Sequence, residues 1–279
     1  MEKILLSQEM LTPGAKWGEE VSGDRILALA KEGAGIDITW INDRNERYLV
    51  FWLEAICNHS VPLKVLVYSK KETSGEPIFD IQFGVLPNIR TGICIDLTWL
   101  DAHALFPETC PGELKVVCHG RRVDHDEVEK IVLQTIPLDN DIQMKWSPLL
   151  MMDEYPEDLI PTDGSALPDA KLIDELGQNK TKEWGSKLHS VQEMVDMLHA
   201  QDAEAEGSYP FENWSVYGGW KDKKLTDGTG FFSSKKVDGR WWLVDPEGYA
   251  FFSVGPDCVV ARSDCRIDGV EKWCDWLPA

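Results

Sequence analysis

The sequence has few basic residues for its length. It contains 28 Lys and Arg against 48 Asp and Glu, which gives a formal net charge of −20 over 279 residues. Binding to a nucleic-acid backbone depends on Lys and Arg displacing counterions from phosphates, so this balance argues against a nucleic-acid partner. We expect most of the acidic side chains to form a solvated surface.

Metal-ligand and nucleotide-binding motifs are also missing. The seven cysteines are an odd number without a CxxC pair, so neither a disulfide framework nor a zinc site is indicated. The six histidines lack metal-ligand spacing, and neither a glycine-rich phosphate motif nor G-x-S-x-G occurs. We expect scattered reduced thiols and no metal site. The cysteines are Cys57, Cys94, Cys110, Cys118, Cys258, Cys265 and Cys274.

Long apolar runs are absent as well. No window approaches the roughly 18 apolar residues of a membrane helix, and residues 1–18 lack the apolar region of a signal peptide. The sequence as written therefore predicts a soluble, cytoplasmic protein without a visible signal peptide and without a membrane partner.

The first half of the chain has the pattern of β-strands. Apolar residues alternate with polar ones, as in Phe79, Ile81, Phe83 and Val85, which predicts strands with one face on a core. Many short strands at regular spacing are typical of an antiparallel sandwich or jelly roll. The strands are expected at 36–41, 47–57, 63–68, 79–85, 93–99, 114–119 and 131–138, within a sandwich that covers residues 1–150.

An acidic, proline-containing connector is expected over residues 151–229. Asp, Glu and Pro are frequent between residues 151 and 170, which favours extended chain. Ser190 and Glu193 then form a capping box ahead of an apolar stripe, which predicts a helix over residues 190–206.

Residues 230–258, GFFSSKKVDGRWWLVDPEGYAFFSVGPDC, read as strands joined by tight turns. Asp238-Gly239 suits a two-residue hairpin with positive φ, so residues 231–237 are expected to pair with residues 240–244. Residues 245–248, Asp-Pro-Glu-Gly, predict a second turn before the apolar run 249–254.

This segment resembles the entry to the catalytic barrel in the agarase-like glycoside hydrolases of family 50 and their relatives. A similar G-F-F, D-G-R-W-W-L-V-D-P-E-G and F-F-S-x-G series occurs there. Residues 172–187, LIDELGQNKTKEWGSK, are similar to the family's segment between an amino-terminal β-sandwich and the barrel. The family has Pro-Gly-Lys after the tryptophan, whereas this chain has Gly-Ser-Lys. The matching positions are Asp174, Gly177, Gln178, Trp184 and Lys187.

The resemblance implies a mainly β chain. It predicts a jelly-roll or galactose-binding-like sandwich, similar to a carbohydrate-binding module, over residues 1–150, and a connector with a helix over residues 151–229. Residues 230–279 would supply a hairpin and the first strand of a truncated (β/α)₈ barrel, at residues 250–255. A whole barrel needs about 250 residues. Retaining glycosidases use two carboxylates about 5 Å apart, and here both are expected beyond Ala279, so no catalytic residue is assigned in this chain.

Aromatic side chains are the candidates for sugar contact, because a pyranose presents an apolar C–H face to a ring. Trp214, Tyr217 and Trp220 lie in the glycine-containing segment NWSVYGGW and are predicted platform residues. Asp257, after the expected barrel strand, is a candidate hydrogen-bond partner for a sugar hydroxyl. Core positions are expected for Trp40, Trp52 and Trp99, and for at least one of Trp241 and Trp242, which should point to opposite faces of one strand.

Three functions stay open from the sequence. The leading one is the non-catalytic amino-terminal portion of an agarase-like or β-galactosidase-like hydrolase of galactose-containing polysaccharide. The others are a stand-alone carbohydrate-binding sandwich and a structural or oligomerisation module. The expected partner is a carbohydrate, a galactan or agaro-oligosaccharide. No cofactor is expected, while a structural calcium ion and a homo-oligomer stay open.

Overall fold

The structure, a computed structural model, describes residues 2–39, 46–164, 171–208, 211–257, 259 and 266–277. The chain divides into two compact units. The first unit combines residues 1–174 with residues 263–279, and the second consists of residues 175–262.

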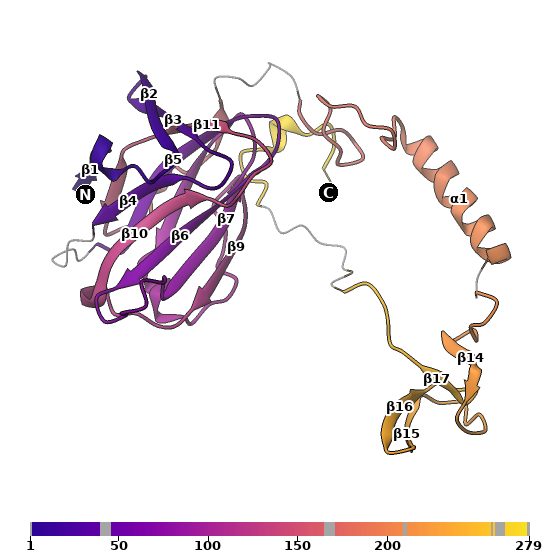
Figure 1. Cartoon of the computed structure of the whole chain (residues 1–279). Coiled ribbons are helices and arrows are strands. Elements are labelled where there is room, and N and C mark those ends of the chain that lie inside the picture. The colour runs from indigo at the N-terminus through magenta and orange to yellow at the C-terminus, as the bar shows by residue number, and fades with distance from the viewer. Residues whose placement is uncertain are drawn as a thin grey trace. The chain divides into compact units, whose positions relative to one another are not determined.

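The first unit is a β-sandwich, which confirms the predicted mainly β fold (Figure 1). One sheet has the strand order β1-β12-β5-β11-β3-β2, with β8 also paired to β5 and β13 paired to β8. The other has the order β4-β10-β6-β7-β9. The described pairs are antiparallel. The strands are β1 Glu2–Ile4, β2 Ala15–Val21, β3 Asp24–Leu29, β4 Gly35–Thr39, β5 Tyr48–Ile56, β6 Val61–Ser69, β7 Phe79–Val85, β8 Ile89–Asp96, β9 Glu113–Gly120, β10 Val128–Thr135, β11 Ile142–Trp146, β12 Leu149–Met152 and β13 Thr162–Asp163.

Alternating side chains build the core between these sheets. In β6, every second residue from Val61 to Ser69 is buried, as the sequence pattern predicts. Phe51 of β5 joins the layers, because its ring stacks on Trp146 at a centroid distance of 6.3 Å and meets Phe83 of the opposite sheet edge-on at 6.5 Å. These rings place the main core between the two sheets.

A segment near the carboxyl end also belongs to the sandwich unit. The backbone N–H groups of Leu172 and Ile173 donate to the carbonyl oxygen of Trp273 at 2.8 and 3.0 Å. The Trp273 indole donates to Asp163 at 2.7 Å, and the ring forms a small buried cluster with Ile89 and Val270. Residues 266–277 therefore complete one end of the first unit.

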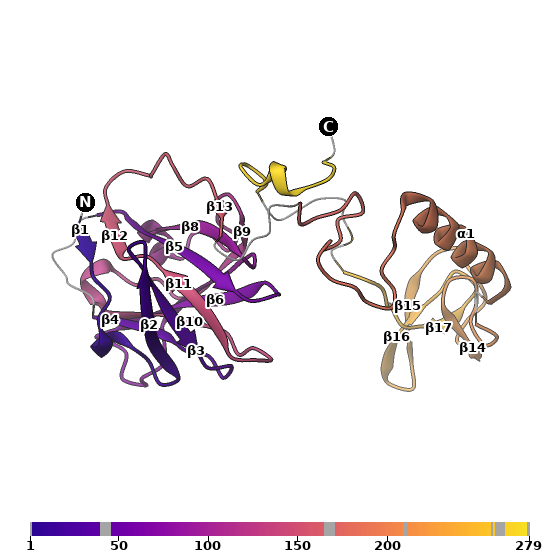
Figure 2. The same ribbon diagram turned by 90° about the horizontal axis from the view of Figure 1, so that it is seen from above.

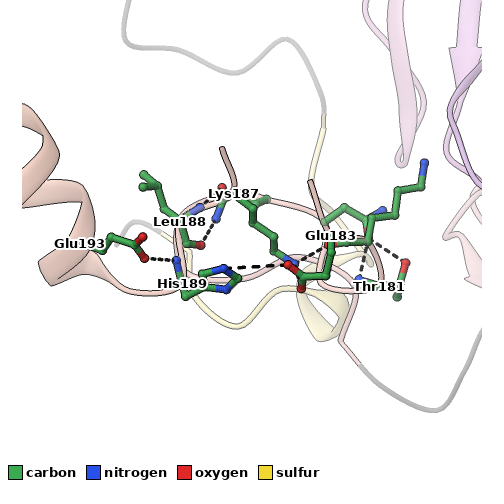
Figure 3. Close-up of polar contacts among 9 residues, drawn as sticks. Thr181, Glu183, Lys187, Leu188, His189 and Glu193 are labelled. Carbon is green, nitrogen blue, oxygen red and sulfur yellow. Dashed lines mark hydrogen bonds and ion pairs between the residues drawn. The ribbon is translucent and has the colours of Figure 1, made fainter. Parts of the chain in front are cut away.

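The second unit begins with a loop that buries a lysine. This lysine is Lys187, whose side chain is 6% exposed. Its Nζ donates to the carbonyl oxygen of Lys182 at 2.6 Å and to Glu183 Oε1 at 3.0 Å (Figure 3). The ammonium lies 5.3 Å from the centre of the Trp184 ring. Gln178 closes the loop, because its amide donates to the Leu188 carbonyl and accepts from the Leu188 N–H. Two of the residues that carry the family resemblance, Gln178 and Lys187, thus hold this loop together.

Helix α1, Val191–Ser208, follows this loop. Ser190 Oγ accepts from the Glu193 N–H at 3.1 Å, which confirms the predicted cap, whereas Glu193 Oε2 accepts from the N–H of His189 at 2.7 Å and not from that of Ser190. Val191 and Leu198 are 45% and 51% exposed, so the apolar stripe is not buried. No helix in the described part of the chain has an apolar stretch long enough to cross a membrane.

A four-stranded antiparallel sheet with the order β14-β17-β16-β15 completes the second unit (Figure 2). The hairpin is as predicted, since Asp238 and Gly239 have φ values of 52° and 79° between β15 and β16. β17 ends at Phe251, so residues 252–255 lie outside it, and the barrel assignment of residues 250–255 stays a prediction. The strands are β14 Gly219–Lys224, β15 Ser233–Val237, β16 Arg240–Val244 and β17 Tyr249–Phe251.

Candidate functional site: an aromatic groove on the small sheet

A groove of about 470 Å³ runs over the four-stranded sheet, within the usual volume range of small-molecule sites. Most of its wall is aromatic or aliphatic, and it combines residues from the loop before β14 and from β14 itself with residues from β16, β17 and the segment after β17. We call it the aromatic groove. Its lining residues are Trp214, Gly218, Trp220, Arg240, Trp241, Trp242, Leu243, Ala250, Phe251, Phe252 and Val254.

A buried carboxylate fixes the loop that carries Trp214 and leads into Trp220 of β14. Asp245, 1% exposed, accepts from the backbone N–H groups of Glu247 at 3.0 Å and Tyr249 at 2.8 Å, which shapes the Asp-Pro-Glu-Gly turn. Its other oxygen accepts the hydroxyl of Ser215, and that hydroxyl oxygen accepts from the Gly219 N–H at 2.9 Å. The loop and the turn are thereby joined across 30 positions of sequence.

Only glycine fits at the crossing point of this network. A Cβ atom added at Gly219 would lie 2.1 Å from Asp245 Oδ2, far inside contact distance. The backbone of Gly219 also pairs with Ser215, whose N–H donates to the Gly219 carbonyl at 2.8 Å. We call Ser215, Gly219 and Asp245 the loop clamp. The clamp places Trp214 and Trp220 on one wall of the groove.

The structure brings two of the four predicted site residues together. Trp214 and Trp220 are paired in an isolated antiparallel β-bridge, and both line the groove. Trp220 is 46% exposed, and its indole N–H donates to Asp222 at 3.1 Å. This hydrogen bond favours one orientation of the exposed ring, which suits a stacking platform.

Tyr217 and Asp257 do not line the groove. The Tyr217 ring meets the Phe232 ring edge-on at a centroid distance of 6.0 Å. The Phe232 ring in turn lies 5.0 Å from the ring of Phe251, which lines the groove. Tyr217 is thus a neighbour of the groove. Asp257 is exposed after the end of β17. The sugar-binding roles of all four residues stay predictions.

Sequence reasoning missed Trp241 and Trp242 as groove residues. At least one of them was expected in a core, yet Trp241 is 67% exposed and Trp242 is half-buried. This expectation was wrong because it assumed a packed layer beneath the strand. Two cations contact the Trp242 ring, Lys223 at 4.0 Å and Arg240 at 4.8 Å from its centre, and they cover part of that ring. The adjacent pair of tryptophans in a hairpin strand was the available signal.

The other tryptophans expected in a core lie in or near the sandwich. Trp99 is half-buried against the main core, and Trp52 is half-buried against a second cluster around Val50 and Leu159. Trp40 lies outside the described residues. Among the described residues, no three His, Cys, Asp or Glu side chains come together in a way that could hold a metal ion.

Comparison with known proteins identifies relatives over part of the chain. Beta-agarase B of Vibrio sp. (strain JT0107) is 40% identical over 112 residues, which is 40% of this chain and 12% of the agarase. Beta-agarase A of the same organism is 32% identical over 109 residues, 37% of this chain and 11% of that agarase. The chain therefore spans about a tenth of the length of these relatives. No protein-family model matches it.

Solved structures give weaker matches. An exo-beta-agarase is 19% identical, with 91% of this chain and 37% of that chain covered and a TM-score of 0.41. The agarase AgWH50C is 20% identical, with coverage of 97% and 43% and a TM-score of 0.42. The sequence relatives are beta-agarases, and they confirm that this chain resembles the agarase-like glycoside hydrolases of family 50.

Proposed function

We propose that this chain is the non-catalytic amino-terminal portion of an agarase-like hydrolase that acts on galactose-containing polysaccharide. The observation that carries this proposal is the 40% identity to Beta-agarase B over 112 residues, which span only 12% of that enzyme. On this proposal the chain alone binds sugar without cleaving it, because the two catalytic carboxylates are supplied elsewhere in the enzyme.

The chemistry of the aromatic groove supports a role in sugar contact. Sugar rings stack their C–H faces on aromatic side chains, and their hydroxyls bond to a few polar groups at the edge. Trp214, Trp220 and Trp241 provide the rings, while Arg240 and Asp222 lie beside them as polar groups. Since binding of this kind depends on stacking, affinity for a neutral galactan should change little with salt.

A second candidate function is supported by the exposed apolar side chains of the same unit, two of which, Phe252 and Val254, also line the groove. Phe231, Phe252 and Val254 are 77%, 81% and 75% exposed. Phe252 and Val254 lie together along the groove, and an exposed apolar patch commonly marks a surface that another protein part covers. A structural or oligomerisation module would use these residues, whereas a sugar platform depends on the tryptophans.

Substitution of one tryptophan separates the two functions. We expect Trp220→Ala to weaken the binding of agaro-oligosaccharides by about 1 to 3 kcal/mol in calorimetry, as for the loss of a large aromatic contact. The melting temperature should stay the same, because nearly half of the side chain is already exposed. Trp184→Ala is the matched control, since Trp184 is 42% exposed and does not line the groove.

Two results would contradict the sugar-platform role. One is equal affinity in Trp220→Ala and the unchanged chain. The other is equal weakening by Trp184→Ala. Hydrolysis of agaro-oligosaccharides that follows the chain through purification would contradict its non-catalytic character.

A further inference from the structure

A second cavity lies in the sandwich unit, apart from the aromatic groove. It has a volume of about 540 Å³ and lies between β5, β8, the segment 104–110, the connector after β12 and the returning segment near the carboxyl end. Every residue that lines it belongs to the first unit. Its volume falls within the range of roughly 300–1,000 Å³ for small-molecule sites.

Three aromatic side chains from separate elements form much of its wall. Tyr48 begins β5, Trp99 lies in the 3₁₀ turn Leu97–Asp101, and Tyr155 follows β12. The rings of Tyr48 and Tyr155 meet edge to face at 5.8 Å and 83°. Tyr155 is 48% exposed, so part of this aromatic pair faces solvent. A wall of this kind suits a ligand with an apolar face.

The charged groups of the cavity already have opposite charges beside them. Asp96 pairs with Arg47 at 2.7 Å, and Arg266 pairs with Asp268 at 2.7 Å and with Glu108 at 3.4 Å. A ligand ion would compete with these pairs, whereas a neutral ligand could hydrogen-bond to their remaining oxygen and nitrogen atoms. The charge arrangement therefore favours a neutral, polar ligand.

The floor of the cavity is chemically inert. Cys94 and Cys110 are buried there, and the Cys94 N–H donates to the Cys110 sulfur at 3.3 Å. Burial raises the pKa of the Cys94 thiol to about 12, and it also raises the pKa of Cys110. Thiols are nucleophiles and metal ligands as thiolates, so these neutral groups provide an apolar floor.

We propose that this cavity is a second carbohydrate-binding site that accepts a short neutral oligosaccharide. The aromatic wall would stack on the sugar, and the paired charges at the rim would bond to its hydroxyls. The site shares its ligand class with the proposed function, but it uses different residues. It can therefore bind sugar even if the aromatic groove does not.

Nuclear magnetic resonance of the whole chain tests this proposal with agarotetraose as the probe. In a Trp220→Ala background, titration should still shift the indole N–H signal of Trp99. Tyr155→Ala should weaken the binding reported by that signal by about fivefold or more. Tyr68→Ala is the control, because Tyr68 is half-buried in the same unit and does not line the cavity. Arg266→Gln is a second cavity variant if Tyr155→Ala lowers the melting temperature.

The outcomes are distinct. A Trp99 signal that does not move, or equal effects of Tyr155→Ala and Tyr68→Ala, overturns the second site. An anionic sulfated carrageenan tetrasaccharide should bind more weakly than agarotetraose, and equal or tighter binding overturns the neutral-ligand assignment. A moving Trp99 signal together with unchanged affinity in Trp220→Ala supports this cavity while contradicting the groove platform.

Discussion

Removal of the Asp245 carboxylate should disorganise the aromatic groove. Asp245→Ala deletes the acceptor of two backbone N–H groups and of the Ser215 hydroxyl, all within a site that is 1% exposed. A hydrogen bond to a charged group contributes about 1.5–3 kcal/mol, and the three share one carboxylate, so their energies are not additive. We expect the free energy of unfolding of the second unit to fall by about 3–5 kcal/mol.

The assay combines thermal unfolding with binding. Both the melting temperature of the second unit and its affinity for agaro-oligosaccharides should fall, because the loop that carries Trp214 and leads into Trp220 of β14 loses its attachment. Glu247→Ala is the matched control, since Glu247 is an exposed carboxylate in the same turn. Ser215→Ala should cause a smaller loss of about 1–2 kcal/mol. If Asp245→Ala unfolds at the same temperature as Glu247→Ala, the loop clamp does not stabilise this unit.

Two further predictions concern other buried ionisable groups. Burial raises the pKa of Glu113 to about 8 from an ordinary value of 4.5, so the folded chain holds a proton that the unfolded chain releases. With respect to this group, the free energy of unfolding should be highest below about pH 4.5 and should fall as the pH rises through 8. At pH 7, Glu113→Gln should therefore have a free energy of unfolding about 3 kcal/mol higher than that of the unchanged chain in denaturant unfolding. A difference between the two chains that stays constant from pH 5 to 8 would refute this. Lys187→Met should leave the Lys182 carbonyl without its hydrogen-bond donor. The rate of amide hydrogen exchange at Leu188 should rise about tenfold, which corresponds to a loss of about 1.4 kcal/mol in the local free energy of opening. Lys180→Met, at an exposed lysine of the same loop, is the control, and equal exchange in both variants would contradict a structural role for the buried lysine.

Local patterns made much of the fold predictable. The alternation in Phe79–Val85 identified β7, Asp238 and Gly239 identified the hairpin, and Ser190 with Glu193 located the start of α1. Each of these signals depends on residues close together in sequence, whose geometry is set by side-chain period, positive φ or capping.

Features that depend on distant residues were not predictable in the same way. The burial of Glu113 and the cavity around Trp99 and Tyr155 need strands and connectors that meet only in the folded chain. The exposure of Trp241 could not be read from its strand, because a period of two gives the face of a residue and not what covers that face. For the groove, the sequence identified the tryptophan loop but not the opposite wall.

The return of residues 266–277 to the sandwich makes the second unit an insertion within the first. Residues 175–262 leave the sandwich after Asp174, and the returning segment places Cys274 in an isolated bridge with Ile173. A shortened chain that stops at residue 150 or 174 would lack Trp273 and would uncover Ile89. The smallest piece that can retain the Trp273 cluster together with the main core is therefore discontinuous in sequence, and deletion studies should replace the insertion with a short linker rather than cut the chain once.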